Sequence, residues 1–254
     1  MPELPASVRI ALWVTSAWQE GGALEAALES ALPDVDAVGS GIRTLDLWRD
    51  LGERTILVAL PSSGDPSSLP RCGPDALAAA LDAEECVVAP GLGAMLVPSW
   101  STFGAPGATG ADAGTRLDWT AYDCEPVPTH RVEALDPRET VRLITGRVLE
   151  VTEQLDALAG QPFDATSARE SLPRPGRWAL PDEVSPQALR AITFAAAIGN
   201  AATAGLDGPQ DALGGSTLQR RLDLLRDLRR VAERALVDAT NAGVAALAQP
   251  STSR

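Results

Sequence analysis

Hydrophobic residues in the first third of the chain come in short runs that end in glycine- or proline-rich segments. Val8–Thr15 has the length and the β-branched and aromatic content of a buried strand, and a helical spacing of apolar residues follows the Gly-Gly pair at 21–22. Thr55–Leu60 and Cys86–Ala89 predict two more buried strands, with a helix between them that opens at Pro74. This alternation predicts an α/β fold with a parallel or mixed sheet.

Three further segments of this part are less regular. Ile42–Leu51 fits either a short helix that ends at Gly52 or a strand. Pro90–Gly114 is rich in proline and glycine and predicts a long loop. Leu117–Cys124 alternates in side-chain character, as a strand with one exposed face should, and we expect it at an edge of the sheet.

The pattern becomes helical after Pro128. Asp136 can cap a helix that has Pro137 in its first turn and apolar residues at spacings of three and four as far as Leu158. Ser185-Pro186 begins a second helix through Ala204, which is apolar nearly all round and is therefore expected in the interior. We read Gly160–Pro181 as an irregular connection.

A third helix is predicted from the capping-box match of Ser216 and Gln219 to about Ala248. Its expected buried stripe comprises Leu218, Leu222, Leu225, Ala232, Leu236 and Ala239. The C-terminal half is thus predicted to be mainly α-helical. We divide the chain into an acidic α/β domain, residues 1–131, and a helical region, residues 132–254, that packs on it.

The charged residues exclude several classes of partner and reaction. Residues 1–131 contain 18 acidic and 7 basic side chains, against 16 and 14 in residues 132–254, within a net charge of −13. Such a field repels phosphate backbones and anionic lipid surfaces, so we expect neither nucleic acid nor a membrane as partner. All 21 basic side chains are arginine, which excludes Schiff-base catalysis and a Walker-type phosphate lysine.

Cysteines and the N-terminus point to a cytoplasmic protein. Cys72, Cys86 and Cys124 are odd in number and lack the C-x-x-C spacing of redox or zinc sites, so reduced structural thiols are expected. Glu3 stands where an export signal would carry positive charge. The long uncharged stretch Val87–Ala111 is broken by three prolines and does not read as a membrane span.

The loops that follow strands gather at one edge of an open α/β sheet, where such folds usually bind ligands. Here those loops are Ser16–Gly22, Pro61–Gly73 and Pro90–Gly114. Aromatic surfaces beside polar groups suit a small organic ligand, although the aromatic residues would equally serve to pin long loops to the core. The candidate ligand-binding residues are Trp18, Glu20, Ser62, Ser63, Asp65, Arg71, Trp100 and Phe103.

Other sequence motifs do not predict a nucleotide, phosphate or metal site. Gly91-Leu92-Gly93 is not a dinucleotide fingerprint, because the third glycine position is Leu96 and Pro98 interrupts the helix that should follow. Carboxylates at Glu20 and Asp65 precede helix starts and favour a cation, amine or hydroxyl over phosphate. They could hold a divalent metal, but solvated loop acids are the simpler interpretation, and no metal site is predicted.

The single histidine, His130, follows Ser62 or Ser63 and Asp123 in the chain order of a hydrolase triad. There is no G-x-S-x-G elbow, so the order alone does not predict a hydrolase. Six arginines on the last helix could dock an anionic partner. They could equally form a solvated face with mixed ion pairs, such as Arg229 with Glu233.

The run Thr55–Pro66, followed by Leu69-Pro70 and Gly73-Pro74, resembles a feature of uncharacterised actinobacterial proteins of similar length. The later Trp119–Tyr122 adds to the resemblance, which implies no activity, cofactor or catalytic residue.

Two functional hypotheses follow. The first is a non-catalytic protein that binds a small molecule or a protein partner through the strand-end loops, with C-terminal helices that support it or form a homo-oligomer; the poverty of catalytic residue types favours it. The second is a small-molecule enzyme that uses loop carboxylates, with or without a divalent metal. No cofactor is predicted.

Overall fold

A computed structural model describes residues 4–104, 113–158, 180–208 and 215–249. Contacts divide the chain into two compact units that interleave along the sequence. The sheet unit comprises Pro5–Leu135, Ala179–Ser185 and Thr240–Arg254, and the helical unit comprises Met1–Leu4, Asp136–Trp178 and Pro186–Ala239. The protein is α/β, with the sheet in the N-terminal half and helices in the C-terminal half, as the sequence predicts.

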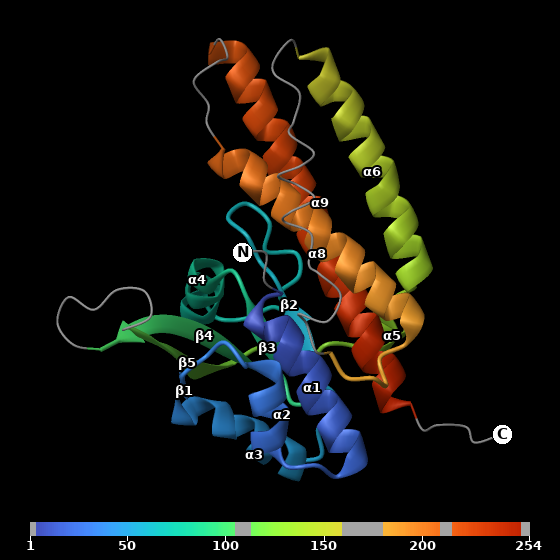
Figure 1. Ribbon diagram of the computed structural model, residues 1–254. Helices are drawn as coiled ribbons and strands as arrows, with labels where there is room; N and C mark the ends of the chain where they lie inside the picture. The colour runs from blue at the N-terminus through green and yellow to red at the C-terminus, as the bar shows by residue number, and fades with distance from the viewer. Residues whose placement is uncertain (1–3, 105–112, 159–179, 209–214, 250–254) are drawn as a thin grey trace. The chain divides into compact units, whose positions relative to one another are not determined.

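The sheet unit is built on a five-stranded mixed sheet in the order β1-β5-β4-β3-β2 (Figure 1). β1 is parallel to β5, and the other neighbouring pairs are antiparallel. The predicted buried strands Thr55–Leu60 and Cys86–Ala89 are confirmed as β2 and β3. The strands are β1 (Ala37–Val38), β2 (Leu57–Ala59), β3 (Cys86–Ala89), β4 (Ala94–Phe103) and β5 (Gly114–Asp123).

Short helices connect and cover these strands. Pro74 opens α4 as predicted, and the helical alternative for Ile42–Leu51 is the correct one: α3 ends just before Gly52, which has a φ of 99°. The helices of this unit are α1 (Ala6–Glu20), α2 (Leu24–Ala31), η1 (Ser40–Arg43), α3 (Thr44–Asp50), α4 (Pro74–Ala83) and α5 (Thr129–Glu133).

The predicted strand Val8–Thr15 is wrong, because this segment lies in the middle of helix α1. Val8, Ile10 and Leu12 are fully buried, and the helix contacts α2, β2 and β3. A helix that is buried on nearly every side has no polar face to reveal its period of 3.6 residues. Its continuous apolar run therefore looks the same in sequence as that of a buried strand.

The predicted loop Pro90–Gly114 is also wrong in part, because it contains the ten-residue strand β4. Pro98 is tolerated there for a topological reason. β3 pairs with β4 only from Ala94 to Leu96, so the missing N–H of Pro98 removes no bond to β3. β1 pairs with β5 only at Arg116 and Leu117, so β5 is second in the sheet order, whereas Asp118–Asp123 has a strand partner on one side only, β4, among the described residues, as an edge position predicts.

The helical unit contains the three long helices that the sequence predicts, lying side by side in Figure 1. They are α6 (Pro137–Ala157), α8 (Pro186–Asp207) and the part of α9 (Gly215–Ala248) that ends at Ala239. Asp136 caps α6 by accepting a hydrogen bond from the N–H of Arg138 at 2.9 Å. The predicted connection Gly160–Pro181 lies almost wholly outside the described residues.

α8 is not interior on every side: Ala191, Ile192 and Ala195 are buried, whereas Leu189 and Arg190 are exposed. Among the described helices it alone has the length and hydropathy that a membrane span requires, which core helices of many folds share. A core in this unit is formed by Val151, Ala202, Leu224 and Leu228, with Val148, Leu155, Leu158 and Ile198 packed against it.

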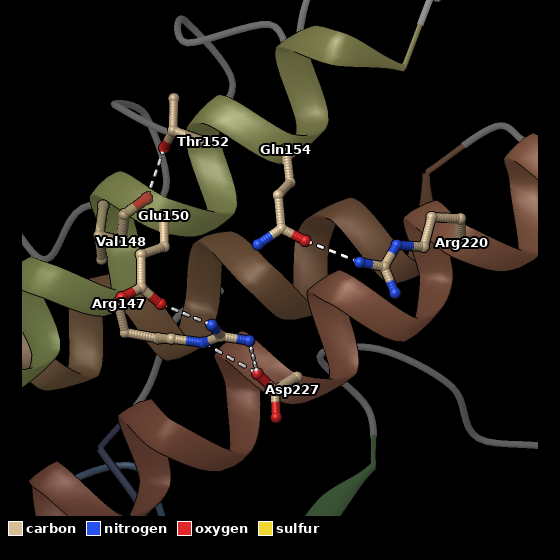
Figure 2. A network of polar contacts seen from close by, with 7 residues as sticks. All are labelled: Arg147, Val148, Glu150, Thr152, Gln154, Arg220 and Asp227. Atoms are coloured by element: carbon tan, nitrogen blue, oxygen red, sulfur yellow. Dashed lines mark hydrogen bonds and ion pairs between the residues drawn. The ribbon is translucent and has the colours of Figure 1, made fainter.

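Polar contacts join α6 to α9 beside that core (Figure 2). Arg147 donates from Nε to the Asp227 carboxylate at 2.9 Å and also bonds Glu150, while Arg220 donates to Gln154 at 2.8 Å. The predicted ion pair of Arg229 with Glu233 forms at 3.2 Å. Arg226 and Arg230 of α9 also pair with acids of the same helix, Asp223 and Asp227, so these three arginines form mixed pairs, as one of the two interpretations of this helix expected.

Candidate functional site

A pocket of about 290 Å³ opens in the sheet unit where β2 begins and β3 ends. That volume is at the small end of the range for ligand sites. The stretch before β2, the turn after β3, helix α5 and the last turn of α9 all contribute to its wall. The pocket is lined by Glu53, Thr55, Leu57, Pro90, Gly91, Val127, Thr129, Val132, Glu133, Ala245, Ala248 and Gln249.

Glu53 fixes one wall of the pocket. It follows the left-handed turn at Gly52, and its N–H donates to the carbonyl of Trp48 at 2.9 Å. Its carboxylate accepts hydrogen bonds from the N–H groups of Gly91 at 2.8 Å, Leu92 at 3.3 Å and Arg54 at 3.2 Å. The side chain is buried, so these bonds replace the water that a carboxylate otherwise needs.

A second carboxylate, that of Glu133 on the exposed side of α5, also lines the pocket. The hydroxyls of Thr55 and Thr129 and the amide of Gln249 add hydrogen-bonding groups, and the rest of the lining is apolar. The C-terminal end of α9 adds the negative end of a helix dipole. Among the residues that the structure describes, no arginine or histidine lines the pocket, so the electrostatic potential of its described wall favours a positive or hydrogen-donating group.

The structure does not gather the three predicted ligand loops at one rim. Ser16–Gly22 is mostly the last turn of α1, where Gln19 donates to the carbonyl of Arg54 at 2.9 Å, just before β2. The first part of Pro61–Gly73 follows the other end of β2. The prediction of a shared cleft depended on a strand where the chain forms α1, and it is corrected with that strand.

The eight candidate residues are distributed accordingly, and none of them lines the pocket. Trp18 is buried in α1, and Glu20 is exposed at its end. Ser62, Ser63 and Asp65 share one tight turn, closed by paired hydrogen bonds between the backbones of Ser62 and Asp65. Arg71 is exposed, and its carbonyl accepts from the N–H of Glu125 at 2.7 Å.

Trp100 and Phe103 are half-exposed on the outer part of β4, where alternation places them on opposite faces of the strand. The ring of Phe103 covers Gly114 on β5, where any Cβ would collide with it. The indole N–H of Trp100 lies 3.4 Å from the carboxylate of Glu85. Each of the two aromatic rings therefore has a structural contact of its own.

Glu85 is a buried carboxylate that the sequence did not single out. It accepts hydrogen bonds from both the N–H and the hydroxyl of Ser7, each at 2.8 Å, at the first turn of α1. Pro5 gives that helix no side-chain cap, so Glu85 serves as one from a distant part of the chain. Burial raises the pKa of Glu85, against the opposing effect of Ser7, Trp100 and Arg9.

The geometry gives little support to the hydrolase triad with His130 or to a divalent-metal site. His130 is exposed on α5 and does not line the pocket, although its neighbour Thr129 does. Within the described ranges, no group of three or more His, Cys, Asp or Glu side chains is placed to hold a metal ion.

Sequence reasoning missed most of the pocket because its walls come from segments far apart in the chain. Of the described lining residues, only Pro90 and Gly91 belong to a loop that the sequence predicts to bind a ligand. Glu53 gives a weak signal, as an acid between the helix-ending Gly52 and a buried strand. Nothing in the pattern of α9 indicates that its last turn joins the sheet unit.

Comparison with known proteins identifies a family without assigning an activity. No curated protein and no solved structure matches the sequence. Residues 7–134 match the family model of the Rv1486c-like protein N-terminal domain, and residues 138–237 match that of the C-terminal domain. The two matches together span most of the chain, and the chain therefore belongs to the Rv1486c-like protein family.

Proposed function

We propose that this is a non-catalytic binding protein that holds a small organic ligand, with an amine or hydroxyl group on an apolar body, in the pocket of the sheet unit. The observation that carries the proposal is the composition of the pocket wall: Glu53 and Glu133 line it together with apolar residues, and no basic side chain is among the described lining residues. The affinity would come from the apolar contacts, and the carboxylates would select for the polar group.

The two carboxylates take different parts in this proposal. Glu53 already accepts three backbone hydrogen bonds, so it supports the wall and contributes a fixed negative charge. Glu133 is exposed and free to move toward a ligand, so it is the residue that contacts the amine. An exposed carboxylate of this kind adds on the order of 1 kcal/mol to the binding of a cation.

The enzymatic alternative required Glu20 and Asp65 in a common cleft. Glu20 lies beside the start of β2 and Asp65 in the turn after its end, so the geometry gives that alternative no support.

Thermal shift measurements with a matched pair of probes test the proposal. Cyclohexylamine and cyclohexanol have the same ring and differ in the cationic group, and we expect a larger rise in Tm with the amine. Glu133→Gln should remove the difference between the two probes. Glu125→Gln removes the same charge from an exposed position outside the pocket and should leave the difference intact.

A second variant guards against nonspecific binding. Ala245→Phe places a ring in the pocket from the last turn of α9 and should abolish the response to both probes. An equal response to the amine and the alcohol, or an undiminished response in Ala245→Phe, would rule the proposal out.

A further inference from the structure

Cys72 and Cys124 lie opposite each other in an antiparallel bridge, just before α4 and just after β5. The hydrogen bond that supports the bridge runs from the N–H of Glu125 to the carbonyl of Arg71 at 2.7 Å. It joins the residues beside the cysteines rather than the cysteines themselves. In such a pair the two Cα atoms are only about 4.5 Å apart, and the side chains approach each other most closely.

This Cα separation lies at the short end of the range of about 4.4–6.8 Å that disulfides span. Both thiols are free and half-buried, so a small oxidant reaches them. The N–H of Cys124 donates to the carbonyl of Gly93 at 2.8 Å, which anchors one side of the pair to the β3–β4 turn. We propose that Cys72 and Cys124 form a redox-controlled disulfide that joins the segment before α4 to the end of β5.

The third cysteine does not share this role. Cys86 lies in β3, between β4 and β2 in the sheet, is fully buried and has no access to solvent. It remains a core thiol while the other two react.

The reaction is an exchange with a low-molecular-weight disulfide such as oxidised glutathione. The thiolate of Cys72, the less buried of the pair, attacks one sulfur of the reagent, forms a mixed disulfide and releases one thiol. The thiolate of Cys124 then attacks the Cys72 sulfur, closes the protein disulfide and releases the second thiol. The two protons lost by the cysteines are taken up by the two released thiolates.

Burial raises the pKa of Cys72, and burial together with Cys72 and Asp123 raises the pKa of Cys124 to about 11. Few thiolates are present at neutral pH, so the disulfide forms slowly and, once formed, acts as a lasting cross-link rather than a fast sensor.

Peptide mapping of the native full-length protein tests the proposal. The reduced protein is incubated with excess oxidised glutathione, its remaining thiols are alkylated after unfolding, and the chain is cleaved at arginine and glutamate. These cleavages place the three cysteines on three separate peptides. We expect the peptide Cys72–Glu84 to be joined to Leu117–Arg131, since the Glu125–Pro126 bond resists cleavage, with Cys86 alkylated. The closed loop should raise Tm by about 5–15 °C, reversibly on reduction.

Two variants complete the test. Cys86→Ala should keep the cross-link, and Cys72→Ser should lose both the cross-link and the rise in Tm. The proposal is overturned if Cys72 and Cys124 remain separately alkylated or glutathionylated in the wild-type protein, or if the linked peptides contain Cys86.

Discussion

At the scale of single residues, buried polar groups distinguish this protein more than any exposed motif. Glu85 caps α1 and accepts from Trp100, and Arg9 makes a two-pronged ion pair with Asp34 while only 5% exposed. A buried charge is stable only when its partners stay in place. The hydrogen bonds of Glu85 and the ion pair of Arg9 offset the cost of burying these two ionisable side chains.

Glu85→Gln should change how stability depends on pH. The pKa of Glu85 is raised in the folded state, so between its unfolded value of about 4.5 and its folded value the native protein holds a proton that the unfolded chain has lost. Wild-type stability therefore falls as pH rises through this window, by up to about 1.4 kcal/mol per pH unit. The glutamine variant lacks this term.

Urea denaturation of both proteins across this pH range measures the effect. The free energy of unfolding of Glu85→Gln should gain on the wild type as pH rises and then level off. A difference that is the same at every pH would contradict the raised pKa. Glu29→Gln, which changes an exposed residue of α2, serves as the control and should show no such trend.

At the scale of elements, the edge strand β2 is protected by a side chain from another element. Asn241, near the end of α9, accepts from the N–H of Val58 at 2.8 Å and donates to its carbonyl at 3.0 Å. The amide thus imitates a neighbouring strand at a position where the sheet has none. An exposed edge would otherwise offer unpaired backbone groups to another chain.

Asn241→Ala should destabilise the sheet unit by about 2–4 kcal/mol, because it leaves one buried donor and one buried acceptor without partners. Asn241→Asp should be no milder, since a carboxylate can accept from Val58 but cannot donate to it. Chemical denaturation gives the change in the free energy of unfolding.

The neighbouring Thr240 provides the control. Its hydroxyl is buried without a hydrogen-bond partner among the described residues, so Thr240→Val should be neutral or stabilise the protein by about 1 kcal/mol. If Asn241→Ala cost no more than Thr240→Val, the edge-capping role would be refuted.

At the scale of the whole molecule, the two units are not consecutive in sequence. The sheet unit takes its last segment from the end of α9, although the rest of that helix belongs to the helical unit. This segment supplies Asn241 and part of the pocket wall. The proposed division at residue 131 describes where the sheet-forming sequence ends, and the C-terminal segment returns to complete the unit that this sequence begins.

Truncation after Ala239 should therefore destabilise the sheet unit more than Asn241→Ala does, because it also removes the buried Ala242 and Val244. Tryptophan fluorescence reports on this unit, since five of the six tryptophans lie within Pro5–Leu135. We expect the fluorescence-detected midpoint in urea to fall sharply. An unchanged midpoint would mean that the N-terminal segment needs nothing from α9.

The sequence by itself determined those elements in which apolar positions are clearly separated from polar ones. The amphipathic helix α6, the capping Asp136 and the strands β2 and β3 between proline- and glycine-rich turns could all be predicted. One apolar face, or a short apolar run with polar ends, is enough to fix the type of such a segment.

Only the tertiary structure decided the rest. Val8–Thr15 became a helix because packing on all sides erases the periodic signal, and β4 accepted Pro98 because its neighbour β3 stops short. The pocket, the cysteine pair and the edge contact of Asn241 each join residues distant in the chain. The local pattern of apolar and polar residues predicts which side chains are buried. It does not predict which distant segments pair, because that depends on the topology of the fold.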